Sequence, residues 1–209
     1  MSSTAELLFQ RLLRDLRPLC AASDFRRRSQ NFICESQECW GVINFQKSRY
    51  SPVDQKSFTI NLALASKRIL AYQGESTSAP PPSYACHWAE IRIGSLMPDR
   101  QDKWWTLSDE ASYVLVEGEV KTVLSELAIP LIKTHLTEQG LLELWAGKTP
   151  GSFEYPRLKY KSILLALQHR FDELPEIFQR IREICGGNLA EVGAEEHIAQ
   201  LKKRFSLPE

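Results

Sequence analysis

The sequence lacks most of the features that identify a protein's chemistry at sight. Its five cysteines include no Cys-x-x-Cys pair, which argues against a structural zinc site and, with their odd number, against a disulfide framework. No apolar run approaches the roughly 18 residues that a transmembrane helix requires. Charged residues interrupt the leucines of the N-terminal segment, which is not the pattern of a signal peptide. We therefore expect a protein of the reducing cytoplasm that does not associate with membranes.

Catalytic motifs are missing as well. The chain contains no Gly-x-Ser-x-Gly elbow, no His-Glu-x-x-His helix and no glycine-rich phosphate loop. Its four histidines are far apart, and His87 falls on the apolar side of a predicted strand, where a core histidine is expected. The sequence accordingly predicts no catalytic residue, no metal site and no cofactor.

A surplus of positive charge is also absent. Lys plus Arg and Asp plus Glu both number 26, so no global field attracts nucleic acid. Residues 26–28 are three consecutive arginines, and beside this acidic content we interpret them as a solvated linker. Nucleic acid is not expected as a partner.

Alternating patterns are present in the first half of the chain. We predict strands at residues 31–35 and 39–47, around a short polar loop, and a further strand in which Phe58, Ile60, Leu62 and Leu64 share one face. Additional strands are predicted at residues 85–93 and, shorter, at 104–107. From residue 117 the periodicity is helical, with Gln139-Gly140 as a break and amphipathic helices at 157–171, 175–185 and 194–205.

Strands followed by helices indicate the α+β class. We expect an antiparallel sheet of four to five strands with helices packed on one face and a C-terminal helical annex. The composition change near Gly147 divides the chain into an α+β domain at residues 1–147 and a helical subdomain at residues 152–209.

Three segments are distinctive in their order and spacing: WGVINFQKSRYSPVDQKSFTINLAL from residue 40, HWAEIRIGSLMP from residue 87 and DKWW from residue 102. With them the chain resembles the bacterial family described as domain of unknown function 4304, over residues 8–136. The resemblance implies no settled activity, no cofactor and no catalytic residues. By analogy of fold alone, small α+β proteins of this build include immunity proteins against toxins.

Polar side chains share the face opposite the predicted core. Thr59 and Asn61 alternate with the core residues, and strand pairing brings Asn44 and Gln46 beside them. Amides offer a donor and an acceptor together, and arginine offers a planar fork of donors. The predicted partner- or ligand-binding surface on this outer face therefore comprises Asn44, Gln46, Arg49, Thr59, Asn61, Trp88, Glu90 and Arg92.

Two functions fit such a surface, and an ordinary solvated sheet face is the third interpretation. The first function, which we favour, is non-enzymatic recognition of a macromolecular partner in an immunity-type or regulatory role. The second is a small enzyme that acts on a polar or phosphorylated substrate at the same face. If the face is exposed, substitution of Asn61 or Arg92 should affect binding and leave stability nearly unchanged.

Overall fold

Five strands follow one another across an antiparallel sheet in the order β1-β2-β3-β4-β5, and a sixth pairs with the far end of β4. The computed structural model describes residues 4–82, 86, 88–147 and 154–208, and of residues 88–90 only the backbone. The strands are β1 Arg26–Arg28, β2 Asn31–Glu35, β3 Cys39–Lys47, β4 Lys56–Ser66, β5 Trp88–Arg92 and β6 Trp105–Leu107. The predicted strands at 31–35 and 39–47 are confirmed to the residue.

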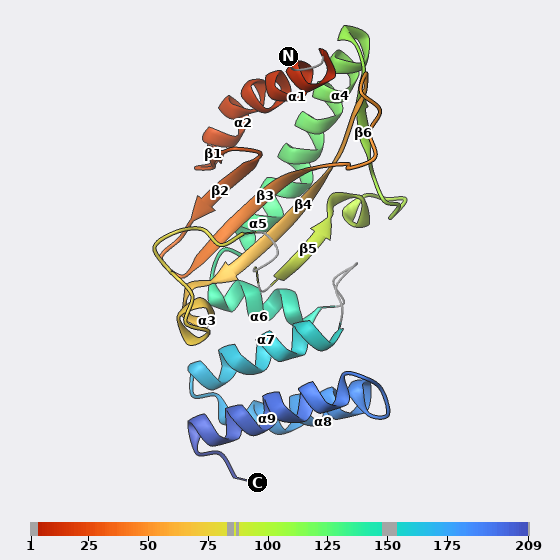
Figure 1. Ribbon diagram of the computed structural model, residues 1–209. Helices are drawn as coiled ribbons and strands as arrows, with labels where there is room; N and C mark the ends of the chain where they lie inside the picture. The colour runs from red at the N-terminus through yellow and green to blue at the C-terminus, as the bar shows by residue number, and fades with distance from the viewer. Residues whose placement is uncertain (1–3, 83–85, 87, 148–153, 209) are drawn as a thin grey trace.

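Helices cover one face of this sheet and continue beyond one of its ends (Figure 1). Helices α1, α4 and α5 lie behind the strands, and α6 to α9 are stacked below them, so that the two termini lie at opposite ends of the molecule. Short helical segments η2 Ile93–Leu96, η3 Leu124–Ala128 and η4 Phe171–Glu173 also occur. The α-helices are α1 Thr4–Asp15, α2 Arg17–Ala21, α3 Lys67–Tyr72, α4 Glu110–Val123, α5 Ile129–Thr134, α6 Glu138–Ala146, α7 Glu154–Leu167, α8 Leu174–Cys185 and α9 Glu191–Phe205. The protein has the predicted α+β fold with a C-terminal helical region.

The core face of the sheet is the one that the alternation in β4 predicts. Phe58, Ile60, Leu62 and Leu64 are fully buried in the main apolar core. Helix α5 approaches β3 closely at Gly41, where a Cβ atom would lie 2.5 Å from Cγ2 of Ile132. Glycine at this position therefore allows the helix to pack directly on the strand.

Two helix boundaries differ from the predictions for local reasons. Helix α4 begins at Glu110 rather than near 117, because Asp109 caps it by accepting a hydrogen bond from the Ser112 amide at 2.8 Å. Gln139-Gly140, predicted to be a break, lies in the first turn of α6, where Thr137 caps the Gly140 amide. Glycine occurs there because a Cβ atom would lie 2.7 Å from the Cα of His135.

The apolar core runs from Leu8 on α1 to Leu201 on α9 without division among the described residues. Helix α7 packs against α3 and α6, and it also contacts α8 and α9. The division at residues 147 and 152 stays a prediction. All five cysteines are buried free thiols, as expected from their spacing. None of the described helices is long and apolar enough to cross a membrane.

Candidate functional site

One row of polar residues crosses the outer face of the sheet from edge to edge. Arg28 on β1 pairs with Asn31 on β2, and Asn31 pairs with Asn44 on β3. Asn44 pairs in turn with Asn61 on β4, and Asn61 with Arg92 on β5. Directly paired residues of antiparallel strands share a face, so these five positions form a single line perpendicular to the strands. Three asparagines stand in the middle and one arginine at each end.

The amides of this row are bonded to one another. Asn44 Nδ2 donates to Asn31 Oδ1 at 2.6 Å. Asn61 Nδ2 donates to Gln46 Oε1 at 2.8 Å and to Asn44 Oδ1 at 3.2 Å. Such a ladder satisfies polar groups on adjacent strands and fixes the strand register.

The expectation that Asn44, Thr59 and Asn61 stand on an open face is wrong. Only 2% of Asn61 and 9% of Asn44 is exposed, and Thr59 is fully buried. Removing a member of a buried network leaves its partners without hydrogen bonds, which costs stability. Substitution of Asn61 is therefore expected to lower stability, and it cannot reduce binding while leaving stability unchanged, as we expected from the sequence.

Part of the outer face is covered by apolar packing instead. Trp40, Val42, Ala63 and Ala65 form a small second core with Leu70 of α3 and with Cys86. The chain that follows α3 passes in front of the strands at this end of the sheet (Figure 1). The alternation in β3 and β4 predicts which residues share this face, but it does not predict what packs on them.

Arg92 is occupied at its end of the row. Its guanidinium forms an ion pair with Asp102 and lies 5.2 Å from the ring centre of Trp104. The indole nitrogen of Trp104 donates to the same carboxylate oxygen of Asp102 at 2.9 Å. Burial alone would raise the pKa of Asp102, but the hydrogen bonds from Arg92 and Trp104 outweigh it and lower the pKa. This cluster is internally satisfied.

The other predicted site residues are not all brought together. Gln46 is exposed and borders Asn61, whereas Arg49 lies in the exposed turn at the distant end of β3. A register shift between β4 and β5 breaks the expected alternation, so the backbone of Trp88 pairs with Leu64, a core-face position. The side chains of Trp88 and Glu90 lie outside the described part of the structure.

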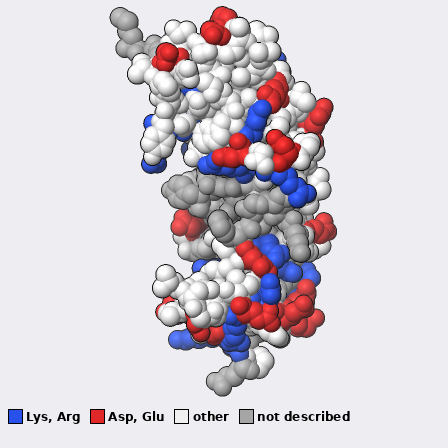
Figure 2. All heavy atoms as spheres, turned by 90° about the vertical axis from the view of Figure 1, so that its right-hand side faces the viewer, with Lys and Arg blue, Asp and Glu red and all other residues white. Residues whose placement is uncertain are grey.

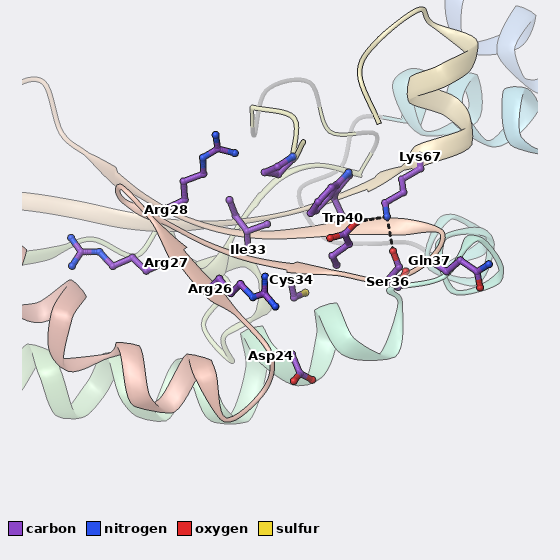
Figure 3. A pocket seen from close by; sticks show the side chains of 12 residues that line it. Asp24, Arg26, Arg27, Arg28, Ile33, Cys34, Ser36, Gln37, Trp40 and Lys67 are labelled. Carbon is purple, nitrogen blue, oxygen red and sulfur yellow. Dashed lines mark hydrogen bonds and ion pairs between the residues drawn. The ribbon is translucent and has the colours of Figure 1, made fainter. Parts of the chain in front are cut away.

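A groove lies at the other end of the row, along β1 and β2 (Figure 3). Its volume is about 680 Å³, and its lining includes Arg26, Arg28, Ile33, Trp40, Lys67 and Pro80. Figure 3 shows Arg28, Ile33 and Trp40 projecting on one side of the strands and Asp24 on the other. We call this hollow the Trp40 groove.

Trp40 supplies the unusual feature of the groove. Only 6% of the residue is exposed, and its indole nitrogen is a buried donor that has no acceptor among the described residues. Lys67 Nζ lies 4.9 Å from the ring centre and donates to Glu35 Oε1 at 2.5 Å and to the Ser36 carbonyl at 2.8 Å. A buried N–H group without a partner costs free energy, and an acceptor from outside would remove that cost.

The three consecutive arginines form strand β1, so their interpretation as a linker is wrong. Arg27 is turned away, because it donates to the Ser29 carbonyl and to Gln10 on α1. Arg26 and Arg28 are exposed, and within the described ranges neither side chain forms a hydrogen bond or an ion pair. Two cations without a partner among the described residues therefore line the same groove as Trp40.

Sequence reasoning missed Arg26, Arg28, Asn31 and Lys67 as parts of this surface. Asn31 could have been found by counting outward from the short loop between β2 and β3, since Glu35 opposite Trp40 places Asn31 opposite Asn44. Lys67 follows a strand end at Ser66, which caps the unpredicted helix α3, and no local pattern indicated its contact with Trp40.

No cluster of metal-ligating side chains occurs among the residues that the structure describes. Burial raises the pKa of Cys34, the thiol that lines the Trp40 groove, to about 12. The thiol therefore stays protonated at neutral pH and is a poor nucleophile. The chemistry that the groove offers is binding through cations, one indole N–H group and apolar contact.

The family model for a domain of unknown function (DUF4304) matches residues 20–134, more than half of the chain, so the protein belongs to that family. The matched range contains all the described strands, with both the polar row and the Trp40 groove, and it excludes α1 and α6 to α9. Comparison with curated proteins and with solved structures finds no match for the chain.

Proposed function

We propose that this member of the DUF4304 family is a non-enzymatic protein that recognises a protein partner, in an immunity-type or regulatory role. The partner places an acidic segment in the Trp40 groove. The row of asparagines supports the groove by holding β2, β3 and β4 in register, and it does not itself contact the partner. This proposal moves the recognition surface from the amides to the adjoining edge of the sheet.

The buried indole N–H group of Trp40 carries the proposal. It has no acceptor within the described part of the chain, and Trp40 lines a hollow that a partner segment could fill. A carboxylate or carbonyl oxygen from the partner would satisfy it, and carboxylates would pair with the exposed guanidinium groups of Arg26 and Arg28. Ile33 and Pro80 provide apolar surface beside these polar contacts.

A protein segment fits these features better than nucleic acid does. Single-stranded nucleic acid is held by several aromatic rings on which successive bases stack. The described lining of the groove has one such ring, that of Trp40, and Lys67 Nζ already lies 4.9 Å from its centre. Figure 2 shows Lys/Arg and Asp/Glu side chains interspersed over another side of the molecule, rather than a field of one sign. The arginines of the groove can pair with individual carboxylates of a partner without a surface field of one sign.

The alternative of an enzyme at the polar row is less well supported. Asparagine and glutamine do not titrate, and arginine keeps its proton, so the described members of the row offer no general acid or base. The three asparagines also form hydrogen bonds with one another. Five buried free thiols accord with the reducing cytoplasm as the proposed location.

Photo-crosslinking tests the proposed surface. Gln37 lines the groove and is exposed, so a photoreactive amino acid at residue 37 should form an adduct with the bound segment. The matched control carries the same amino acid in place of Leu189, a fully exposed residue in the distant α8–α9 turn. We expect residue 37, and not residue 189, to crosslink to a peptide rich in Asp and Glu. Equal adducts from both positions, or a crosslinked peptide without acidic residues, would refute the proposal.

A further inference from the structure

A second hollow lies between α3 and the C-terminal helices α7 and α9. Its volume is about 550 Å³, and among the described residues it shares none of its lining with the Trp40 groove. His197, Gln200 and Arg204 reach it from α9, at a spacing that places them along one side of that helix. We call this hollow the α3–α9 cleft; its lining also includes Tyr72, Gln73, Lys159 and one carboxylate, Glu75.

A buried histidine forms part of the wall of this cleft. His197 Nε2 lies 2.8 Å from Ser162 Oγ, and Ser162 Oγ donates to the Lys159 carbonyl at 2.8 Å. The serine hydroxyl has one hydrogen, so Nε2 carries the proton of the imidazole and donates it to Ser162. Nδ1 is then left as an acceptor. Burial, aided by the charge of Lys159, lowers the pKa of His197 to about 4, so the ring is neutral at physiological pH.

Two cations of the cleft, Arg204 and Lys159, have no carboxylate partner among the described residues. The guanidinium of Arg204 lies 4.2 Å from the ring centre of Tyr72, and that ring stacks in turn on Phe205. Stacking on a ring fixes the plane of the guanidinium and leaves its N–H groups free around the edge. Over the residues that the structure covers, neither Arg204 nor Lys159 forms an ion pair or donates a side-chain hydrogen bond. Arg180 and Arg182 on the neighbouring helix α8 are both paired with glutamates.

We infer that the α3–α9 cleft binds a small phosphorylated molecule that also carries a hydroxyl group. Arg204 and Lys159 match a phosphate, which accepts hydrogen bonds from a guanidinium fork and from an ammonium group. The neutral His197 presents an acceptor for the hydroxyl group. The volume suits a small molecule, and the cleft lies apart from the surface proposed for the partner.

Such a ligand would connect two parts of the chain. Tyr72 belongs to the region that the family model covers, whereas Lys159 and Arg204 belong to the helices beyond it. A ligand that contacts both stabilises the docked arrangement, because binding to the folded state alone raises the melting temperature.

Calorimetric titration of the full chain tests this site. The probes are glycerol 3-phosphate and inorganic phosphate, with glycerol as the uncharged control. We expect glycerol 3-phosphate to bind more tightly than inorganic phosphate, and glycerol not to bind. Arg204→Gln and Lys159→Gln should each weaken binding by about tenfold or more, the usual effect of losing a charge-assisted hydrogen bond.

Two further variants make the test specific. Lys203→Gln removes a charge from an exposed residue of α9 that does not line the cleft, and it should bind like the wild type. Arg204→Lys keeps the charge and loses the planar fork, so its affinity should be intermediate. Absence of binding to either phosphate, or equal losses in Lys203→Gln and Arg204→Gln, would overturn the site. Equal affinity for the two phosphates would overturn the role of His197.

Discussion

Replacing Phe58 by alanine is expected to lower the free energy of unfolding by about 3–5 kcal/mol, the usual cost of deleting a buried aromatic ring. The ring is fully buried, with ring centres at 5.3 Å to Phe9, 5.8 Å to Phe45 and 5.6 Å to Trp105. It thus joins α1, β3, β4 and β6. A small cavity at this point removes contacts from all four elements, and urea denaturation would measure the loss.

Two comparison variants keep this prediction testable if the alanine variant fails to fold. Phe58→Leu retains most of the volume and should cost less than about 1.5 kcal/mol. Tyr50→Ala removes an aromatic residue that is 94% exposed and should change stability by less than about 0.5 kcal/mol. A loss below about 1 kcal/mol for Phe58→Ala would mean that the core does not centre on this face of β4.

Reversing both free charges of the groove, with Arg26→Glu and Arg28→Glu together, is expected to weaken partner binding by roughly 100-fold. Each exposed guanidinium that pairs with a carboxylate contributes on the order of 1 kcal/mol, and the introduced carboxylates add repulsion. Neither arginine forms a hydrogen bond or ion pair within the described chain, so thermal stability should change little. Affinity for the crosslinked partner, measured by calorimetry, and the melting temperature together check this prediction.

The matched control reverses two charges elsewhere. Arg49→Glu with Lys203→Glu makes the same change in net charge at exposed residues outside the groove. If this control weakens binding as much as the groove variant does, the effect is one of overall charge. If neither pair weakens binding, the arginines of β1 do not recognise the partner.

The parts of the fold that follow from short-range periodicity could be predicted from the sequence. Strands β2 and β3 have the predicted bounds, and the alternation from Phe58 to Leu64 identifies the core face. Period 2 works here because one face of each strand is apolar. Helix α6 was missed because Gly140 is typical of a break, and only the close approach of His135 explains its place in a helix.

The site was less accessible to sequence reasoning, because it depends on what covers each side chain. The alternation of residues along β3 and β4 predicts that Asn44, Asn61 and Thr59 share one face of the sheet, and the observed strand register agrees. The burial of the two asparagines is accompanied by a hydrogen bond between them, whereas the buried Thr59 hydroxyl has no partner among the described residues. The role of β1 was hidden for a similar reason, since a three-residue edge strand of arginines has the composition of a linker.

The indole N–H resonance of Trp40 offers the most direct measurement of the central proposal, that a partner segment fills the Trp40 groove. A 1H–15N spectrum should contain one indole signal for each of the five tryptophans, and Trp40→Phe would assign the signal in question. When the crosslinked acidic segment is added as a peptide, a new hydrogen bond to Nε1 should move the Trp40 signal downfield. The signal of Trp145, which is buried on α6 in the helical region, should stay in place. A Trp40 signal that does not move at saturating peptide would contradict the proposal.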